Sequence, residues 1–538
     1  MNKSTTGEGP IVKTNSGILL GGWADDKQTT RLFRGIPYAK PPLGHLRWKP
    51  AEPLASSEAE RLCLNFSPSG LQPYWHQVEG ILHRPMAQMS EDCLYLNIWA
   101  PDKKAGEGRF PVMVWLHGGG LMEGGSSMPL YDGEELAKKG VIVVSINYRL
   151  NIFGYFSHPE LTEESPTNAS GNYGLSDQIQ ALKWVQENIA AFSGDPDNVT
   201  VFGESAGAYS VMQLLVSPIA QGLFHKAIVQ SGYMPPIPDL KQPVFDCSSA
   251  EDDGLRFQQA LGKNNLSALR AMTGDELLSA YNSLGHKTAP VVDGWLIKEQ
   301  LFETLEKGTH HKVPVLAGFN SGEGNHYAEH RGVLAADIPN NQTDYIDQVQ
   351  ALYGERSEYY LTLYPPEDLS SATLNPIRDG YYGWGTHKLI NDFSRSVKPV
   401  YLYYFDHAMA WAREQSLGAF HTSDLPFSFN NVAKNVKYSF NWPDLHPTKA
   451  DIAMANTISD YWVAFARDGE PKPKGLPQWQ PYSQQSRHHM VFKDGDACPS
   501  KDLLLDSYQF YEHLFKERRQ QSKSWWLSNI GLLAPLPG

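Results

Sequence analysis

The sequence is poor in cysteine, and it lacks long apolar runs and a secretory leader. The four cysteines, Cys63, Cys93, Cys247 and Cys498, are too few for a disulfide scaffold and lack the paired spacing of a zinc site. No apolar run approaches the ~18 residues that a membrane-spanning helix needs. The first residues carry no apolar segment of the kind that a signal peptide requires, although a removed leader would leave the same sequence. We therefore expect no membrane span.

Long runs of one charge are also missing. The net charge of −13 is spread along the chain and is not gathered in blocks. Nucleic acids and anionic membranes attract concentrated positive charge, so we expect neither as a partner. Repeats, low-complexity segments and Ser/Gly-rich linkers do not divide the chain, and we expect one large domain over residues 1–538.

What the chain does have is an alternation of short apolar runs with amphipathic helical segments. An apolar run buried on both faces is typical of a parallel strand, and segment 174–191 repeats apolar residues at helical spacing. Such alternation predicts an α/β fold: a large, mostly parallel sheet with helices on both faces. Helical insertions over the sheet are expected at about 247–281 and 332–378. The runs expected to form strands are 112–116, 141–146, 199–202, 227–229 and 313–317.

The most informative segment is Val199–Gly207, a β-branched run that ends in Gly-x-Ser-x-Gly and continues into a helix-like stretch. A serine between a strand and a helix sits on a turn so tight that its hydroxyl projects above the sheet edge. The flanking glycines are needed because a Cβ there would collide with neighbouring elements. The positive end of the following helix points at the same place. Ser205 is therefore predicted to be a nucleophile.

A nucleophilic serine also needs N–H donors for the oxyanion. The run His117–Gly120 contains three successive glycines directly after the strand expected at 112–116. Glycines let backbone N–H groups turn inward with no side chain in the way. A merely flexible turn would not explain this position after a core strand. We expect the N–H groups of Gly119, Gly120 and Ala206 to bind the oxyanion.

The base must be one of 18 histidines. His421 lies in a loop that follows the apolar run 400–405, late in the chain, as the order serine, acid, histidine requires. His407 and His446 are the alternatives. We therefore predict His421 as the base.

The acid should lie on a loop after an earlier strand. Glu323 lies on a glycine-flanked loop directly after the run 313–317. Asp293 and Asp424 compete with it, but Asp293 precedes any strong strand and Asp424 is better placed to brace the histidine loop. We therefore predict Glu323 as the orienting acid.

Together these motifs resemble the type-B carboxylesterase family, the cholinesterase-like α/β-hydrolases. The similarity extends over nearly the whole chain, and the combination of motifs is highly specific. The segments that carry it are Phe33–Ala39, Ser90–Trp99, the run at His117–Gly120, Gly171–Gln178, Asn188–Gly207, the loops at Glu323 and His421, and Asp460–Ala466.

The resemblance implies a complete set of catalytic groups. It supports a triad of Ser205, Glu323 and His421 and agrees with the three N–H donors named above. It also implies that Glu204 lines the floor of a gorge beside the serine and that Ser231 braces the acid. No metal or organic cofactor is implied.

The resemblance further implies a disulfide between Cys63 and Cys93, because the family commonly closes this loop with one. Such a bond would favour an oxidising compartment, so we expect a secreted or periplasmic protein rather than a cytoplasmic one. Cys247 and Cys498 are expected to be free. The oligomeric state is expected to be a monomer or a homodimer.

The sequence thus predicts a serine hydrolase that cleaves small-molecule carboxylic esters. A lipase or thioesterase on the same triad is the alternative, and a non-catalytic binding protein is disfavoured because the predicted catalytic groups are all present. Cholinesterase activity is disfavoured because the surroundings of Trp75 do not resemble a quaternary-ammonium site. Aromatic side chains near the catalytic segments are candidate substrate contacts, and we expect at least half of them to fill the core instead. They are Trp75, Tyr381, Tyr382, Trp384, Phe420, Phe427 and Phe429.

Overall fold

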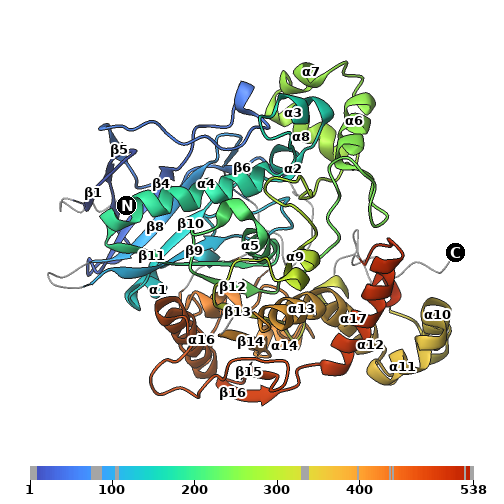
Figure 1. The fold of residues 1–538 in the computed structure, drawn as a ribbon. Helices are drawn as coiled ribbons and strands as arrows, with labels where there is room; N and C mark the ends of the chain where they lie inside the picture. The colour runs from blue at the N-terminus through green and yellow to red at the C-terminus, as the bar shows by residue number, and fades with distance from the viewer. Residues whose placement is uncertain are drawn as a thin grey trace.

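A computed structural model of the protein describes residues 9–73, 86, 88–102, 108–328, 338–396, 399–434, 438, 442–525 and 529–533. Within these residues an eleven-stranded sheet runs through the molecule (Figure 1). In spatial order its strands are β16 (Asp496–Lys501), β15 (His488–Lys493), β14 (Val400–Phe405), β13 (Val315–Asn320), β12 (Lys226–Gln230), β11 (Gly194–Glu204), β9 (Phe110–Leu116), β10 (Ile142–Ile146), β8 (Tyr95–Pro101), β4 (Thr30–Pro37) and β3 (Gly22–Trp23).

The inner strands of this sheet, from β15 to β10, pair in parallel, and antiparallel pairs form both edges. All five runs expected to be strands lie in the parallel part, which confirms the predicted α/β architecture. Strand β11 begins earlier than expected. Residues 194–198 also belong to it, and Gly194 pairs with Phe110 before a break in register.

Two hydrophobic clusters cover the two faces of the sheet. Val112 and Val114 of β9 point into one cluster, whereas Met113 and Trp115 point into the other, because successive side chains of a strand alternate between faces. Helices α4 (Tyr173–Asn188) and α5 (Ala206–Val216) pack into the first cluster. Helix α16 (Lys449–Asp468) packs into the second, on the opposite side of the sheet (Figure 1).

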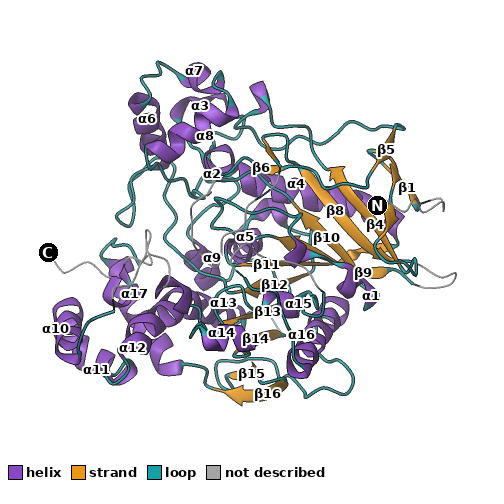
Figure 2. Ribbon diagram, turned by 180° about the vertical axis from the view of Figure 1, so that it is seen from behind, coloured by secondary structure: helices purple, strands orange, loops and turns teal. Residues whose placement is uncertain are grey.

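The remaining helices surround this core (Figure 2). They are α1 (Glu134–Lys138), α2 (Asn151–Tyr155), α3 (Pro159–Glu164), α6 (Ala250–Ala260), α7 (Leu266–Arg270), α8 (Gly274–Ser283), α9 (Leu301–Lys307), α10 (Gln342–Tyr353), α11 (Ser357–Leu363), α12 (Leu369–Ile377), α13 (Trp384–Phe393), α14 (Ala410–Glu414), α15 (Leu425–Ser428) and α17 (Leu505–Gln520). A π-helical segment, η7 (Arg378–Gly383), joins α12 to α13. Short strands β1 (Ile11–Thr14), β2 (Gly17–Leu20) and β5 (Glu60–Leu62) form a separate small sheet, and β6 (Ser69–Gly70) pairs with β7 (Met89–Ser90).

The two expected helical insertions are α6–α8 and α10–α12, while residues 332–337 of the second lie outside the described residues. Helices α6–α8 pack with α2 and α3 around a third hydrophobic cluster. Helices α10 and α11 pack on α17, where Tyr353 and Tyr360 contact the ring of Phe510. In Figure 1 both groups of helices lie on the right of the molecule, α6–α8 above α10–α12.

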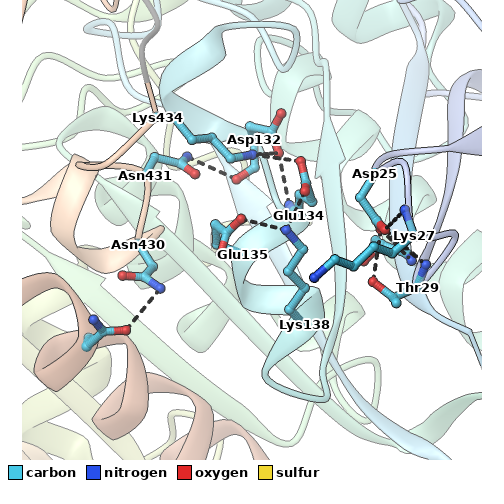
Figure 3. Close-up of polar contacts among 12 residues, drawn as sticks. Asp25, Lys27, Thr29, Asp132, Glu134, Glu135, Lys138, Asn430, Asn431 and Lys434 are labelled. Carbon is cyan, nitrogen blue, oxygen red and sulfur yellow. Dashed lines mark hydrogen bonds and ion pairs between the residues drawn. The ribbon is translucent and has the colours of Figure 1, made fainter. Parts of the chain in front are cut away.

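Ion pairs and hydrogen bonds join the segment after α15 to the loop before α1 and to the first residue of α1 (Figure 3). Lys434 Nζ lies 3.0 Å from both Asp132 Oδ1 and Glu134 Oε2. Asn431 Nδ2 donates to the carbonyl groups of Leu130 and Asp132. These contacts join two segments that are 300 residues apart in the chain at the edge of the second cluster.

A fully buried ion pair holds α4 to the segment after β10. Arg149 donates from Nη2 to Asp177 Oδ1 at 2.6 Å and from Nε to Asp177 Oδ2 at 2.8 Å, with 3% and 0% of the two side chains exposed. The Arg149 backbone N–H also donates to Asp177. A buried charge that loses its partner is strongly destabilising, so the pair holds this helix in place.

Replacing Asp177 by Asn should therefore lower the free energy of unfolding by about 3–5 kcal/mol, because the guanidinium of Arg149 would stay buried without a counter-charge. Denaturant titration followed by tryptophan fluorescence measures the change. Glu52→Gln is the matched control, since its pair with Lys40 is about half exposed and should contribute little. Equal effects of the two substitutions would contradict this account of the buried pair.

Candidate active site

Ser205 lies on the turn between β11 and α5. Its φ of 55° and ψ of −123° are unusual for a residue that is not glycine, and its backbone N–H donates to Gln230 O at 3.0 Å. The neighbouring glycines allow this turn. A Cβ on Gly203 would lie 2.5 Å from the carbonyl carbon of Gly207, and one on Gly207 would lie 2.0 Å from Leu116 O. Strand, serine and helix thus have the arrangement that the sequence predicted.

The glycine run after β9 passes beside this serine. A Cβ on Gly118 would lie 3.3 Å from Cβ of Ser205 and 2.8 Å from Glu204 Oε2. Gly119 and Gly120 have φ values of +113° and +63°, which side-chain-bearing residues rarely adopt. A Cβ on Gly119 would also collide with Glu123 O at 2.2 Å. Only glycine fits this close approach of backbone to the nucleophile.

Glu323 follows β13 and is completely buried. Its Oε2 accepts a hydrogen bond from His421 Nδ1 at 2.6 Å. Its Oε1 accepts from the backbone N–H of Asn320 at 2.8 Å and from Ser231 Oγ at 2.5 Å. Both oxygens are therefore held by donors from different elements, and the carboxylate is fixed in direction as well as in place.

His421 lies in the loop between α14 and α15 and is 4% exposed. Its Nε2 lies 3.2 Å from Oε1 of Glu204, the residue that directly precedes Ser205. Burial by itself would lower the pKa of His421. The negative charges of Glu204 and Glu323 outweigh burial, and the pKa of His421 lies above its ordinary value.

A buried network of hydrogen bonds contacts the loop that carries His421. Asp424 accepts hydrogen bonds from Gln230 Nε2 at 2.7 Å and from Asn320 Nδ2 at 3.1 Å. Asn320 Nδ2 also donates to the carbonyl of Phe420, and Trp462 Nε1 donates to Gln230. Burial raises the pKa of Asp424. These bonds link Asp424 to residues at the ends of β12 and β13, and the sequence did not point to Asn320 or Gln230.

Two further rings contact His421. The ring centroid of His326 lies 5.5 Å away at an interplanar angle of 21°, and that of Tyr382 lies 4.8 Å away. Tyr382 was among the aromatic candidates, but sequence reasoning missed His326. The available signal was its position, three residues after Glu323 on the same glycine-rich loop.

Several other candidates occupy the core. Phe420 packs on Trp411 and Trp442, Phe427 packs on Phe405, and Phe429 packs on Trp115. Trp384 packs on Phe515, and its Nε1 donates to Glu512 of α17 at 2.7 Å. Tyr381 stacks on Tyr233. Trp75 lies outside the described residues.

The alternative acids and bases have other contacts. Asp293 accepts from Asn172 Nδ2 and from the backbone N–H groups of Trp295 and Ile297, which shapes its own loop. His407 Nε2 lies 2.8 Å from Asp451 Oδ1 in the core. His446 is exposed.

The expected disulfide is wrong, because Cys63 and Cys93 are both free thiols in the structure. The two side chains have different surroundings. Cys63 Sγ donates to the carbonyl of Arg61, two residues earlier, whereas Cys93 lines a small cavity with Arg47 and Arg149. Burial raises the pKa of the Cys63 thiol to about 11 and raises that of Cys93 still further. Cys247 and Cys498 are free, as expected.

Within the described ranges, no group of three or more His, Cys, Asp or Glu side chains is arranged to hold a metal ion. No helix in the same part of the chain is long and apolar enough to cross a membrane.

Glu204 gives the site a testable pH dependence. A histidine acts as a base only when neutral, so a raised pKa of His421 should place the loss of kcat/KM with falling pH above ~6.5, the usual histidine value. Glu204→Gln removes one of the negative charges that raise this pKa, and activity should then persist to lower pH. Rates at constant ionic strength from pH 5 to 9 measure this. The exposed Glu52→Gln is the control, and an unchanged profile in Glu204→Gln would refute the assignment.

Comparison with known proteins agrees with this geometry. The model of the carboxylesterase family matches residues 8–510. The fumonisin B1 esterase of Sphingopyxis macrogoltabida is 34% identical over 484 residues, which cover 88% of this chain and 84% of that protein. The para-nitrobenzyl esterase of Bacillus subtilis is 34% identical over 503 residues, 89% of this chain and 94% of that one.

Two more similarities extend over more of the chain. The human cocaine esterase is 34% identical over 541 residues, covering 95% of this chain and 92% of that protein. Among solved structures, a Geobacillus stearothermophilus carboxylesterase superimposes with a TM-score of 0.77 and 31% identity, over 93% of this chain and 99% of that one.

Proposed function

Because the chain belongs to the carboxylesterase family and has an α/β-hydrolase fold, it is a carboxylic ester hydrolase, and we propose that Ser205, His421 and Glu323 carry out its reaction. The observation that carries this assignment is the buried hydrogen bond of 2.6 Å between His421 Nδ1 and Glu323 Oε2. It joins an acid and a base from separate loops beside a serine on a strained strand–helix turn.

In the proposed acylation step, Ser205 Oγ attacks the ester carbonyl while His421 Nε2 takes the hydroxyl proton. The bond to Glu323 keeps the Nδ1 proton in place, so that Nε2 is the basic nitrogen, and the carboxylate stabilises the imidazolium that forms. The carbonyl oxygen becomes an oxyanion on the N–H groups of Gly119, Gly120 and Ala206. The amino-terminal end of α5 adds its positive dipole there.

The tetrahedral intermediate then collapses. The bond to the alkoxide oxygen breaks, His421 gives its proton to the leaving alcohol, and an acyl-enzyme remains on Ser205. Water enters, loses a proton to His421 and attacks the same carbonyl. The bond to Ser205 Oγ then breaks, His421 returns the proton to this oxygen, and the carboxylic acid leaves.

The substrate is proposed to be a water-soluble or dispersed ester with a sizeable group. Three of the relatives are named for fumonisin B1, cocaine and para-nitrobenzyl esters, which supports this. Lipase or thioesterase activity on the same triad is the second candidate. The proposal treats residues 1–538 as one catalytic domain, acting as a monomer or homodimer. Because Cys63 and Cys93 are free thiols, no disulfide between them supports secretion or a periplasmic location.

Ser205→Ala should lower kcat by as much as about a million-fold, because the acyl group would have no nucleophile to accept it. Glu323→Gln should be milder, since it disturbs the orientation and charge of His421 and leaves the nucleophile intact. Steady-state hydrolysis of p-nitrophenyl butyrate measures both, with thermal melting as the control for folding. The nucleophile assignment fails if Ser205→Ala keeps a tenth of the wild-type rate.

Short and medium acyl esters should be hydrolysed faster than emulsified long-chain triglycerides. No amphipathic segment of the kind that an interfacial lipase exposes is evident in the sequence. Parallel rates on p-nitrophenyl butyrate and emulsified triolein test this. A preference for triolein, with activation above its solubility limit, would favour the lipase alternative.

A further inference from the structure

The loop that carries Glu323 brings a second histidine to the base. His326 lies in η5 (Asn325–Ala328), and its ring stacks on that of His421 with centroids 5.5 Å apart and planes 21° apart. The two side chains are 3% and 4% exposed. Two near-parallel, offset imidazoles in the interior, one of them the proposed base, form a contact that the mechanism above does not use.

Hydrogen bonds between the two loops bring the two histidines close together. The N–H of Gly322 donates to Ala419 O at 2.9 Å, and Gly322 forms an isolated parallel bridge with Phe420. Asn325 Nδ2 donates to Leu417 O at 2.8 Å. Because these bonds flank both histidines, the rings are held together by the main chain as well as by their own packing.

Two tyrosines extend this contact to a row of four rings. Tyr327 packs on His326 with centroids 4.2 Å apart, and Tyr382 packs on His421 with centroids 4.8 Å apart. Tyr382 comes from η7, and π-helical turns are rare and are found mostly at functional sites. Two elements, η5 and η7, therefore place rings against His421.

The hydrogen bond to Glu323 does not by itself fix His421. It holds Nδ1, but the ring can still swing about that point, and Nε2 lies 3.2 Å from Oε1 of Glu204, the residue before Ser205. A ring packed against the imidazole face restricts this swing. When His421 carries the proton of Ser205, the same face supplies π electrons to the imidazolium.

We propose that His326 is a positioning residue, whose ring holds the His421 imidazole in the orientation that serves Ser205. The proposal rests on the proposed function of Ser205 and His421. A base that is misplaced by about 1 Å can lose as much as 100-fold in rate, so the contact has a measurable effect. The acids Glu204, Glu323 and Asp424 surround the base and remain unchanged in the test.

The test compares His326→Ala, which removes the ring, with His326→Phe, which keeps a ring face. His326→Ala should lower kcat for p-nitrophenyl butyrate roughly 10- to 100-fold with little change in KM. His326→Phe should restore kcat to within about threefold of wild type, because a phenyl face also packs on an imidazolium. The downfield proton NMR signal of the His421 Nδ1–H bond to Glu323 should broaden in the Ala variant and persist in the Phe variant.

His310→Ala is the matched control. His310 is about as buried as His326, and its ring packs on an aromatic ring that is not part of the proposed site, Phe393, with centroids 4.0 Å apart. It should leave kcat unchanged. Wild-type kcat in His326→Ala, or a loss in His326→Phe as large as in His326→Ala, would overturn the positioning role. Ser205→Ala is assayed in parallel. Turnover in that variant would show that the proposed function is wrong. If Ser205→Ala is inactive, the results for the His326 variants test the positioning role alone.

Discussion

The hydrogen bond between His421 Nδ1 and Glu323 Oε2 is the interaction on which the arrangement of the site depends. Its partners follow β13 and β14, which are parallel neighbours, so their carboxyl ends bring the two loops to the same edge of the sheet. Ser231, at the end of β12, and the backbone of Asn320 fix the second carboxylate oxygen. Three consecutive strands thus deliver the groups that orient one imidazole, and β11 delivers the serine turn beside it.

The charge balance of this buried site follows from the same geometry. His421 lies between Glu323 at one ring nitrogen and Glu204 at the other, and both carboxylates are fully buried. Little water is present to screen these charges, so they outweigh the cost of burying an imidazolium and raise the pKa of His421. The site therefore favours the protonated base, which helps the steps that form the imidazolium and limits activity in acid.

The parts of the site that the sequence could predict are those set by local chain geometry. Ser205, the glycines after Leu116 and the acid loop all follow apolar strands, and a residue directly after a strand has a defined place at the sheet edge. Contacts among side chains from distant loops could not be predicted in this way. The ring of His326 meets His421 only because the loops at Gly322 and Ala419 pair. The Cys63–Cys93 disulfide was implied by the family resemblance alone, and the structure has two free thiols there. An aromatic residue such as Trp384 carries no signal in the sequence for the side to which its ring turns.

Covalent trapping of the nucleophile tests the central claim most directly. A p-nitrophenyl phosphonate transfers its phosphonyl group to an activated serine and releases p-nitrophenol in the same step. The account predicts one equivalent of p-nitrophenol per chain, complete loss of esterase activity and a single adduct on the peptide that contains Ser205, identified by tandem mass spectrometry. An adduct on another residue, or ester hydrolysis that continues while Ser205 is fully modified, would contradict it.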